Sequence, residues 1–262
     1  MHLVIADIHS IITQVWNDMR MYTQKSPDLN SFFKKVLNLT AKEFRRERFT
    51  HACIVWPDYS SSRRRQKDPM YDFDRLVLPN SAFPLIMKLN KRFQDLGFAV
   101  MSHPGVEAFD IMAYFVQKIG GRDDVDVTLI TKDDRAWSLI SDSVKVSFGA
   151  SSGANNLIMT PTRFDAMFGE HGLKPNQYLS HKLLSDMDGL GPQKAYGLLK
   201  KYGTLEEIDK VKDEIEGRAG KVLQSSMKSQ GRQLYRRYFP LKIEKLGITL
   251  SDLIYQNEAI AG

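Results

Sequence analysis

Cysteine is almost absent from this 262-residue chain, and apolar runs of membrane-spanning length and internal repeats are absent altogether. With one cysteine the chain can form no internal disulfide, and no zinc-binding pattern is present. Cys53 lies in the apolar run HACIVW, which predicts a buried thiol in a reducing compartment. The N-terminus leads straight into LVIAD, without the pattern of a signal peptide. We therefore expect a soluble, cytoplasmic protein with no membrane partner.

Charge is present in excess, and it is unevenly distributed. The chain is 42% hydrophobic, which is typical of a globular protein, and its formal net charge is +6. Residues 189–245 contain 13 Lys and Arg against 7 Asp and Glu, so this segment accounts for the whole excess. The basic C-terminal part favours a polyanionic partner such as nucleic acid.

Residues 1–160 show an alternation of strand and helix patterns. We predict strands at 3–6, 51–56, 98–101, 125–130 and 144–148, with an edge strand at 157–159. The helices between them are expected at 8–22, 30–48, 81–96, 106–119 and from 134 to 140. This order predicts an α/β domain with a mainly parallel, twisted sheet and helices on both faces. Residues 161–262 are expected to form a helical region.

Carboxylates recur where the predicted strands end. Asp7 ends the first strand, and Asp133 and Asp134 follow the strand at 125–130. Glu107 and Asp110 lie three residues apart, at the start of the helix at 106–119. The carboxyl ends of parallel strands share one edge of a sheet, and Mg²⁺ prefers oxygen ligands. The other explanation is that acids complement the helix dipole and that Asp is a common turn residue.

The segment 57–80 differs from its surroundings because it combines three consecutive arginines with aromatic residues and lacks periodicity. Arg63, Arg64 and Arg65 are followed by Tyr71 and, a few residues later, by Arg75. Cations that follow phosphates and rings that stack on bases suit single-stranded nucleic acid. A solvated surface loop explains the same segment equally well.

The sequence GLGPQKAYGLLKKYG, residues 189–203, predicts a glycine turn that opens a lysine-bearing helix. Gly189 and Gly191 would let backbone N–H groups approach a phosphate at the positive end of the helix. Lys194, Lys200 and Lys201 supply charge for contacts to the DNA backbone. Together with a helix at 176–184, this segment predicts a helix-hairpin-helix near residues 176–202.

In this order, the motifs resemble those of the 5′-nuclease family, which includes phage flap endonucleases, bacterial 5′→3′ exonucleases and the 5′-nuclease domain of DNA polymerase I. VIAD matches the family's first strand, GVEAFD its GxEADD motif, LITKDDR its Thr-x-Asp-x-Asp motif and GLGPQKA its hairpin. Arg64, Tyr71 and Arg75 fall at the spacing of the family's arch residues. The resemblance covers nearly the whole chain and implies a PIN-like 5′-nuclease core with an arch at 57–80.

The resemblance also implies roles for single residues. Catalytic carboxylates that hold Mg²⁺ or Mn²⁺ would be Asp7, Glu107, Asp110 and Asp133. Asp134, Asp186 and Asp188 are approximate counterparts of further metal ligands. The DNA-binding residues would be Arg63, Arg64, Arg65, Tyr71, Arg75, Gly189, Gly191, Lys194, Lys200 and Lys201.

Four departures from the family pattern bear on the chemistry. Pro57 stands where the family has an Asp that closes the second strand, and Asp72 stands where it has an arch lysine. Phe109 and Arg135 replace two carboxylates. Each missing carboxylate removes a ligand and a countercharge, and a guanidinium among the acids repels a cation. We therefore expect that metal binds weakly or not at all and that cleavage is slow or absent.

Three hypotheses follow. The favoured one is a nuclease-derived protein that binds flaps, junctions or 5′ ends of DNA without efficient cleavage. In the second, the protein is a working Mg²⁺-dependent 5′ nuclease in which the nearby acids Asp58, Asp134 and Asp188 substitute by small shifts. The third is a non-catalytic subunit that works with replication proteins. We expect a monomer, and the short chain fits a phage protein in a bacterial host.

Overall fold

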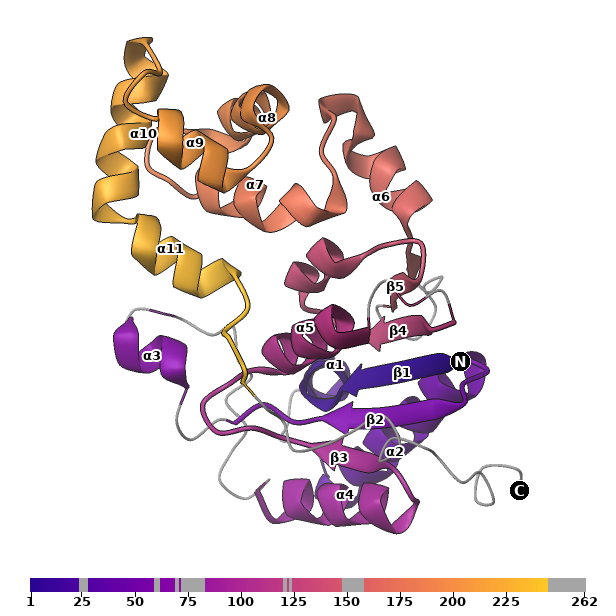
Figure 1. The fold of residues 1–262 in the computed structure, drawn as a ribbon. Helices are drawn as coiled ribbons and strands as arrows, with labels where there is room; N and C mark the ends of the chain where they lie inside the picture. Colours follow the sequence, from indigo (N-terminus) through magenta and orange to yellow (C-terminus); the bar gives the residue numbers. More distant parts are fainter. Residues whose placement is uncertain are drawn as a thin grey trace. The chain divides into compact units, whose positions relative to one another are not determined.

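The computed structural model describes residues 1–23, 28–58, 62–68, 71, 83–119, 122, 124–147 and 158–244 (Figure 1). The chain forms two compact units. The first contains residues 1–134, 143–158 and the chain from 242 onward, and the second contains residues 135–142 and 159–241. Within the described part of the chain, no helix combines the length and apolarity needed to cross a membrane.

The first unit is built on a six-stranded sheet with the strand order β3-β2-β1-β4-β5-β6. The pairs β1–β2, β1–β4, β2–β3 and β4–β5 are all parallel, as the sequence predicted. The strands are β1 (His2–Asp7), β2 (His51–Val55), β3 (Ala99–Met101), β4 (Asp126–Ile130), β5 (Val144–Ser147) and β6 (Ile158–Met159).

The central strands are apolar and buried along nearly their whole length, as expected for parallel strands covered on both faces. In β1 every residue from Leu3 to Asp7 is buried. Because β1 lies between β2 and β4, the residues that follow these three strands meet at one edge of the sheet. Cys53 in β2 is fully buried, as predicted, and burial raises the pKa of its thiol.

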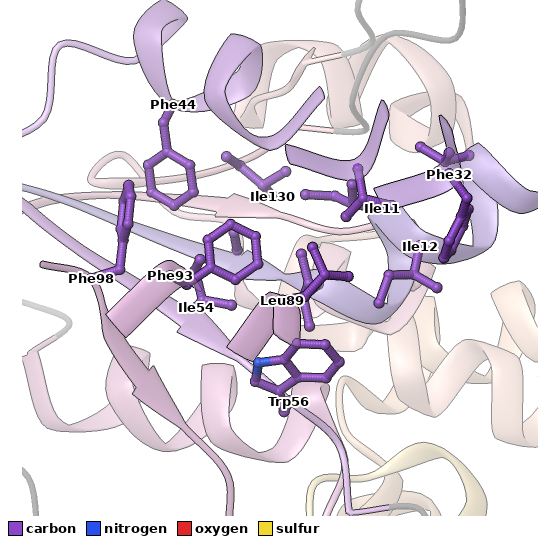
Figure 2. Packing of buried hydrophobic residues seen from close by; sticks show 14 of the residues in the cluster. Ile11, Ile12, Phe32, Phe44, Ile54, Trp56, Leu89, Phe93, Phe98 and Ile130 are labelled. Atoms are coloured by element: carbon purple, nitrogen blue, oxygen red, sulfur yellow. The ribbon is translucent and has the colours of Figure 1, made fainter. Parts of the chain in front are cut away.

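One face of the sheet is covered by α1 (Ile8–Thr23), α2 (Leu29–Arg46) and α4 (Phe83–Asp95). Figure 2 shows their contacts: Phe44, Phe93 and Phe98 gather near Ile54 of β2. The rings of Phe44 and Phe98 have centroids 4.9 Å apart. Burying side chains of this size stabilises the fold by roughly 1.5–3 kcal/mol each. A fourth helix, α5 (Ala108–Ile119), contacts β1 and is not part of this cluster, so helices cover both faces.

Three local features differ from the sequence prediction. The arginine-rich segment contains a short helix, α3 (Arg63–Lys67), begun by Ser62, whose hydroxyl accepts a hydrogen bond from the backbone of Arg65. The helix expected from residue 106 begins at Ala108, so Glu107 precedes it. The helix expected after residue 134 is the 3₁₀ helix η2 (Asp134–Leu139).

The second unit is helical, in agreement with the sequence. Its α-helices are α6 (Pro161–Phe168), α7 (Tyr178–Ser185), α8 (Gly191–Tyr202), α9 (Leu205–Val211), α10 (Gly217–Ser229) and α11 (Gly231–Tyr238), and its 3₁₀ helices include η3 (Gly169–His171) and η4 (Pro175–Gln177). Helices α7 and α8 pack against each other, and α11 packs against α7.

Candidate active site and nucleic-acid interface

Asp7 lies at the carboxyl edge of the sheet and accepts hydrogen bonds from uncharged donors. Its Oδ2 accepts the hydroxyls of Ser10, at 2.6 Å, and Thr131, at 3.0 Å, and its Oδ1 accepts the backbone N–H of His9 at 3.0 Å. The hydroxyl of Thr131 also accepts the backbone N–H of Asp133 at 3.0 Å. The structure therefore brings Asp7 and Asp133 to the same edge through Thr131.

Asp110 and Glu107 form a second acidic group, at the start of α5, and a buried arginine holds it. The two guanidinium nitrogens of Arg64 donate to the two oxygens of Asp110, each at 2.7 Å. The Nη1 atom of Arg64 also lies 3.4 Å from Oε1 of Glu107. Arg64 is only 1% exposed, and both acids are buried. Water screens these charges little, so the ion pair is strong in this geometry.

Asp110 has a structural task in addition to this ion pair. Its Oδ2 accepts the backbone N–H of Glu107 at 2.8 Å, which satisfies a donor at the start of α5. Stabilising the start of a helix, the alternative role for this acid, is therefore part of what it does. Glu107 in turn accepts the hydroxyl of Tyr71 at 3.2 Å.

The loop before α5 is tied to the segment that carries α3. The side chain of Asp58 accepts the backbone N–H of Gly105 at 2.8 Å, and the backbone N–H of Arg63 donates to the carbonyl of Gly105 at 2.9 Å. Asp58 thus binds the loop, in contacts that the sequence did not indicate. Pro57 beside it is buried.

Arg64 and Arg135 have partners that the sequence did not predict. Arg64 was predicted to contact DNA, yet its guanidinium is buried against Asp110 and Glu107. Arg135 was expected among the acids, and the structure shows its Nη1 donating to the carbonyl of Arg237 at 3.1 Å, inside the second unit. The partner of Arg64 could not be predicted because it lies in a run of three arginines. Arg64 is buried while its two neighbours are exposed, and the sequence does not reveal which side chain faces inward.

Several further predictions lie elsewhere or outside the described residues. Phe109 is completely buried and offers no oxygen to a cation. Asp134 opens η2. Asp72 and Arg75 lie outside the described residues.

Asp186 and Asp188 belong to the second unit, where residues of α11 and the turn before it contact them. The hydroxyl of Tyr238 donates to the side chain of Asp186. Gln230 donates to the side chain of Asp188 at 2.6 Å. Both of these donors are uncharged, so neither cancels the charge of its carboxylate.

A divalent cation does not fit the side chains as they are arranged. Among the described residues, no three His, Cys, Asp or Glu side chains are grouped so that they could hold a metal ion. Both oxygens of Asp110 bind Arg64, and both oxygens of Asp7 accept protein donors. Two of the acids that the resemblance implied as metal ligands are therefore engaged by the protein itself.

The turn before α8 has the backbone that its glycines predict. Gly189 and Gly191 have φ angles of 82° and 71°, in the region that residues with a Cβ rarely adopt. A Cβ at Gly191 would meet no atom within 4 Å, so the turn is open there. Lys194 donates to the carbonyl of Gly189 at 2.8 Å and thereby fixes the turn, while Lys200 is exposed.

Behind this turn, three rings stack. Tyr196 of α8 lies between His171 and His181, with centroids 4.2 Å and 3.9 Å away. Burial lowers the pKa of His181, which favours its neutral form. The contact between His181 and Tyr196 therefore joins α7 to α8, and the neutral form of His181 places no charge between the two helices.

A pocket of about 450 Å³ opens beside α3 in the first unit. It is lined by Arg63, His103, Lys242, Ile243 and Glu244. Two permanent cations face one carboxylate, so the pocket is net positive. Nothing in the sequence pattern pointed to it, because Lys242 is far from Arg63 along the chain and only the fold joins them.

Comparison with known proteins identifies relatives of the chain. The family model described as "5'-3' exonuclease, N-terminal resolvase-like domain" matches residues 2–169. DNA polymerase I of Mycobacterium tuberculosis is 27% identical over 188 residues, which are 69% of this chain and 20% of the polymerase. The chain thus spans about a fifth of these polymerase relatives. A flap endonuclease Xni of Serratia proteamaculans is 26% identical over 217 residues, 79% of this chain and 80% of that protein.

Solved structures share the fold. A variant of the phage T5 5′-exonuclease superposes with a TM-score of 0.61 at 20% identity, covering 90% of this chain and 86% of the other. The phage T5 flap endonuclease in complex with DNA and metal ions superposes with a TM-score of 0.56 at 20% identity, over 91% and 88% of the two chains. The likeness extends over about nine tenths of this chain, so these structures share its fold.

Proposed function

Because the chain belongs to the 5′-3′ exonuclease family, we propose that it binds branched or 5′-ended DNA and cleaves it slowly or not at all. The observation that carries this proposal is the bidentate pair of Arg64 with Asp110. It cancels the charge of a carboxylate that the sequence predicts as a metal ligand. Phe109, buried and apolar, adds no ligand in its place.

The cofactor of any residual cleavage is proposed to be Mg²⁺ or Mn²⁺, weakly bound. A divalent cation is supported by the divalent metal ions (zinc) bound to the T5 5′-exonuclease. Asp7, Glu107, Asp110 and Asp133 are the residues proposed to face it. Weak binding follows from the contacts described above, because Asp7 and Asp110 would have to exchange protein donors for the cation.

DNA is proposed to contact exposed cations in each unit. In the first unit, Arg63 and Arg65 flank the buried Arg64, and Arg63 and Lys242 line the net positive pocket. A phosphate group suits this pocket because two cations can share its charge. In the second unit, the turn at Gly191 and the exposed Lys200 are proposed to meet the DNA backbone as one part of a helix-hairpin-helix.

The alternative is an active flap endonuclease. It is supported by the position of Asp7 and Asp133 at one edge of the sheet, both joined to Thr131. It also agrees with the relative from Serratia proteamaculans, which is named a flap endonuclease. A monomeric state, contact with replication proteins and a phage origin remain predictions.

Binding and cleavage of one labelled 5′-flap DNA, compared with a duplex of equal length, test the proposal. We expect binding in EDTA that weakens steeply with salt, because phosphate contacts release counterions. We expect cleavage in Mg²⁺ or Mn²⁺ to stay far below the roughly 1 s⁻¹ typical of enzymes.

Fast turnover or failure to bind DNA would each contradict the proposal. A turnover near or above about 1 s⁻¹ would establish the active enzyme and overturn the proposal. Failure to bind either DNA at low salt would contradict both the proposal and the alternative. Replacing Lys200 and Lys201 together by Met should weaken binding of flap and duplex alike, since contacts to phosphates carry no sequence information.

A further inference from the structure

We infer that Arg64 is an internal counter-cation for Glu107 and Asp110, and that its docking on Asp110 and the binding of a divalent cation to Asp110 exclude each other. The inference deepens the proposed function, on which it rests, because it names what controls the acidic site. It begins from a disagreement within the described residues: four acids that match the family pattern are present, yet they do not form a group that fits a cation.

The geometry explains why the two states compete. Both oxygens of Asp110 accept a nitrogen of Arg64 at 2.7 Å. A cation could use Asp110 only after at least one of these bonds has broken. A guanidinium that stayed nearby would repel the cation, so the whole side chain has to leave.

The charges of the three side chains show why a cation would take the place of the guanidinium. Glu107 and Asp110 carry two negative charges, and Arg64 supplies one positive charge. The hydroxyl of Tyr71, which donates to Glu107, is neutral. The three ionised side chains together therefore carry one net negative charge. A doubly charged cation in its place would face the same two acids with one positive charge more.

The segment that carries Arg64 is itself held beside the loop before α5. Arg64 lies in the first turn of α3, a helix of five residues. The neighbouring Arg63 is tied to the loop before α5 by its backbone bond to Gly105. These contacts keep the guanidinium against Asp110 and Glu107, in the place that a cation on Asp110 would need.

Metal binding without DNA tests the inference. Mn²⁺ binding is measured by the electron paramagnetic resonance of the free ion, with the parent and with Arg64→Met. Lys67→Met is the matched control because it removes one charge from the exposed side of the same helix. We expect Arg64→Met to bind Mn²⁺ at least about tenfold more tightly than the parent, a change typical of altered ligand surroundings. The control should bind like the parent.

Thermal unfolding provides a second measurement on the same proteins. In EDTA, Arg64→Met should unfold at a lower temperature than the parent, because two buried acids lose the guanidinium that lies against them. Mn²⁺ should raise the unfolding temperature of Arg64→Met and leave that of the parent almost unchanged. A folded Arg64→Met that binds Mn²⁺ no more tightly than the parent would overturn the inference.

If Arg64→Met does not fold, the parent protein decides the question. The guanidinium protons of Arg64 should be protected from exchange and visible by nuclear magnetic resonance in EDTA. They should stay protected at Mg²⁺ concentrations that leave the unfolding temperature of the parent unchanged, and they should disappear at concentrations that raise it. Protection that persists while Mg²⁺ raises the unfolding temperature would contradict the inference. Binding of flap DNA in EDTA is measured separately, so that failure of the proposed function is distinguishable from failure of the inference.

Discussion

Asp7 and Asp110 are both buried carboxylates near the carboxyl edge of the sheet, yet different donors hold them. Asp7 accepts hydroxyl and backbone N–H groups, all of them uncharged. Asp110 accepts two nitrogens of the Arg64 guanidinium. Hydrogen bonds from neutral donors stabilise a carboxylate and leave its charge in place, whereas a guanidinium cancels that charge. Although both carboxylates are buried, Asp7 can therefore attract a cation, whereas Asp110 attracts one much less strongly.

The largest expected effect comes from breaking the charged pair. Arg64→Met should lower the free energy of unfolding by about 3–5 kcal/mol, because two buried acids lose the guanidinium that lies against them. Urea unfolding monitored by circular dichroism measures this change. Adding Asp110→Leu to Arg64→Met should recover part of the stability, since an apolar pair replaces a broken ion pair. A decrease below about 1 kcal/mol would show that Arg64 is not the counter-cation.

Phe109→Asp tests whether a family carboxylate can simply be restored beside Asp110. The side chain of Phe109 is completely buried, so the change removes a core ring and buries a charge. We expect the free energy of unfolding in urea to fall by about 3–5 kcal/mol. Phe109→Leu keeps the site apolar and should cost less. Restoration of flap cleavage by Phe109→Asp alone, at unchanged stability, would contradict this expectation.

A smaller effect is expected at Asp7. Ser10→Ala and Thr131→Val each remove one hydroxyl that donates to Asp7, and hydrogen bonds to charged groups contribute about 1.5–3 kcal/mol. Ser229→Ala is the control, because its hydroxyl donates to a helix carbonyl at an exposed position and its removal should change stability by less than about 0.5 kcal/mol. If either Asp7 variant destabilises as much as Arg64→Met, the two acids are held equally strongly.

The three consecutive arginines extend the comparison to DNA binding. Arg63 and Arg65 are exposed and Arg64 is buried. Replacing Arg63 and Arg65 by Met should reduce the slope of log affinity against log salt by about 1 for each phosphate that the variant no longer binds. Arg64→Met should leave that slope unchanged wherever the variant is folded. A smaller slope of log affinity against log salt for folded Arg64→Met would show that Arg64 itself contacts DNA phosphates.

The smallest expected effect concerns a buried group that is kept neutral. Burial lowers the pKa of His181, so the unfolded chain takes up a proton more readily than the folded one. Stability should therefore fall as the pH drops through about 6.5, the ordinary pKa of histidine. Between pH 8 and pH 5, we expect the melting temperature of His181→Gln to fall less than that of the parent, by no more than about 4 °C. An identical fall in both proteins would assign the pH dependence to other groups.

The strands were predictable because buried parallel strands are continuous apolar segments with a distinctive composition. The pattern LVIA before Asp7 and the β-branched run at 125–130 both correspond to observed strands within one or two residues. Helix α3 was not predicted, because five residues are too few to show a period and Ser62 supplies its start through a single hydroxyl. The later start of α5 depends on the bond between the backbone of Glu107 and Asp110, which apolar spacing does not reveal.

By itself, the sequence determined the parallel sheet and the helical second unit, because these follow from local apolar periodicity. It also showed that acids recur where strands end, because each acid directly follows an apolar segment or begins a helix. Only the tertiary structure decided which charges meet. Arg63, Arg64 and Arg65 are the same residue type in one run, and the fold buries one of them against an acid 46 residues away. Lys242 likewise meets Arg63 only because the chain returns to the first unit. Charge pairing depends on distance and burial, and neither is encoded in the local pattern of residues.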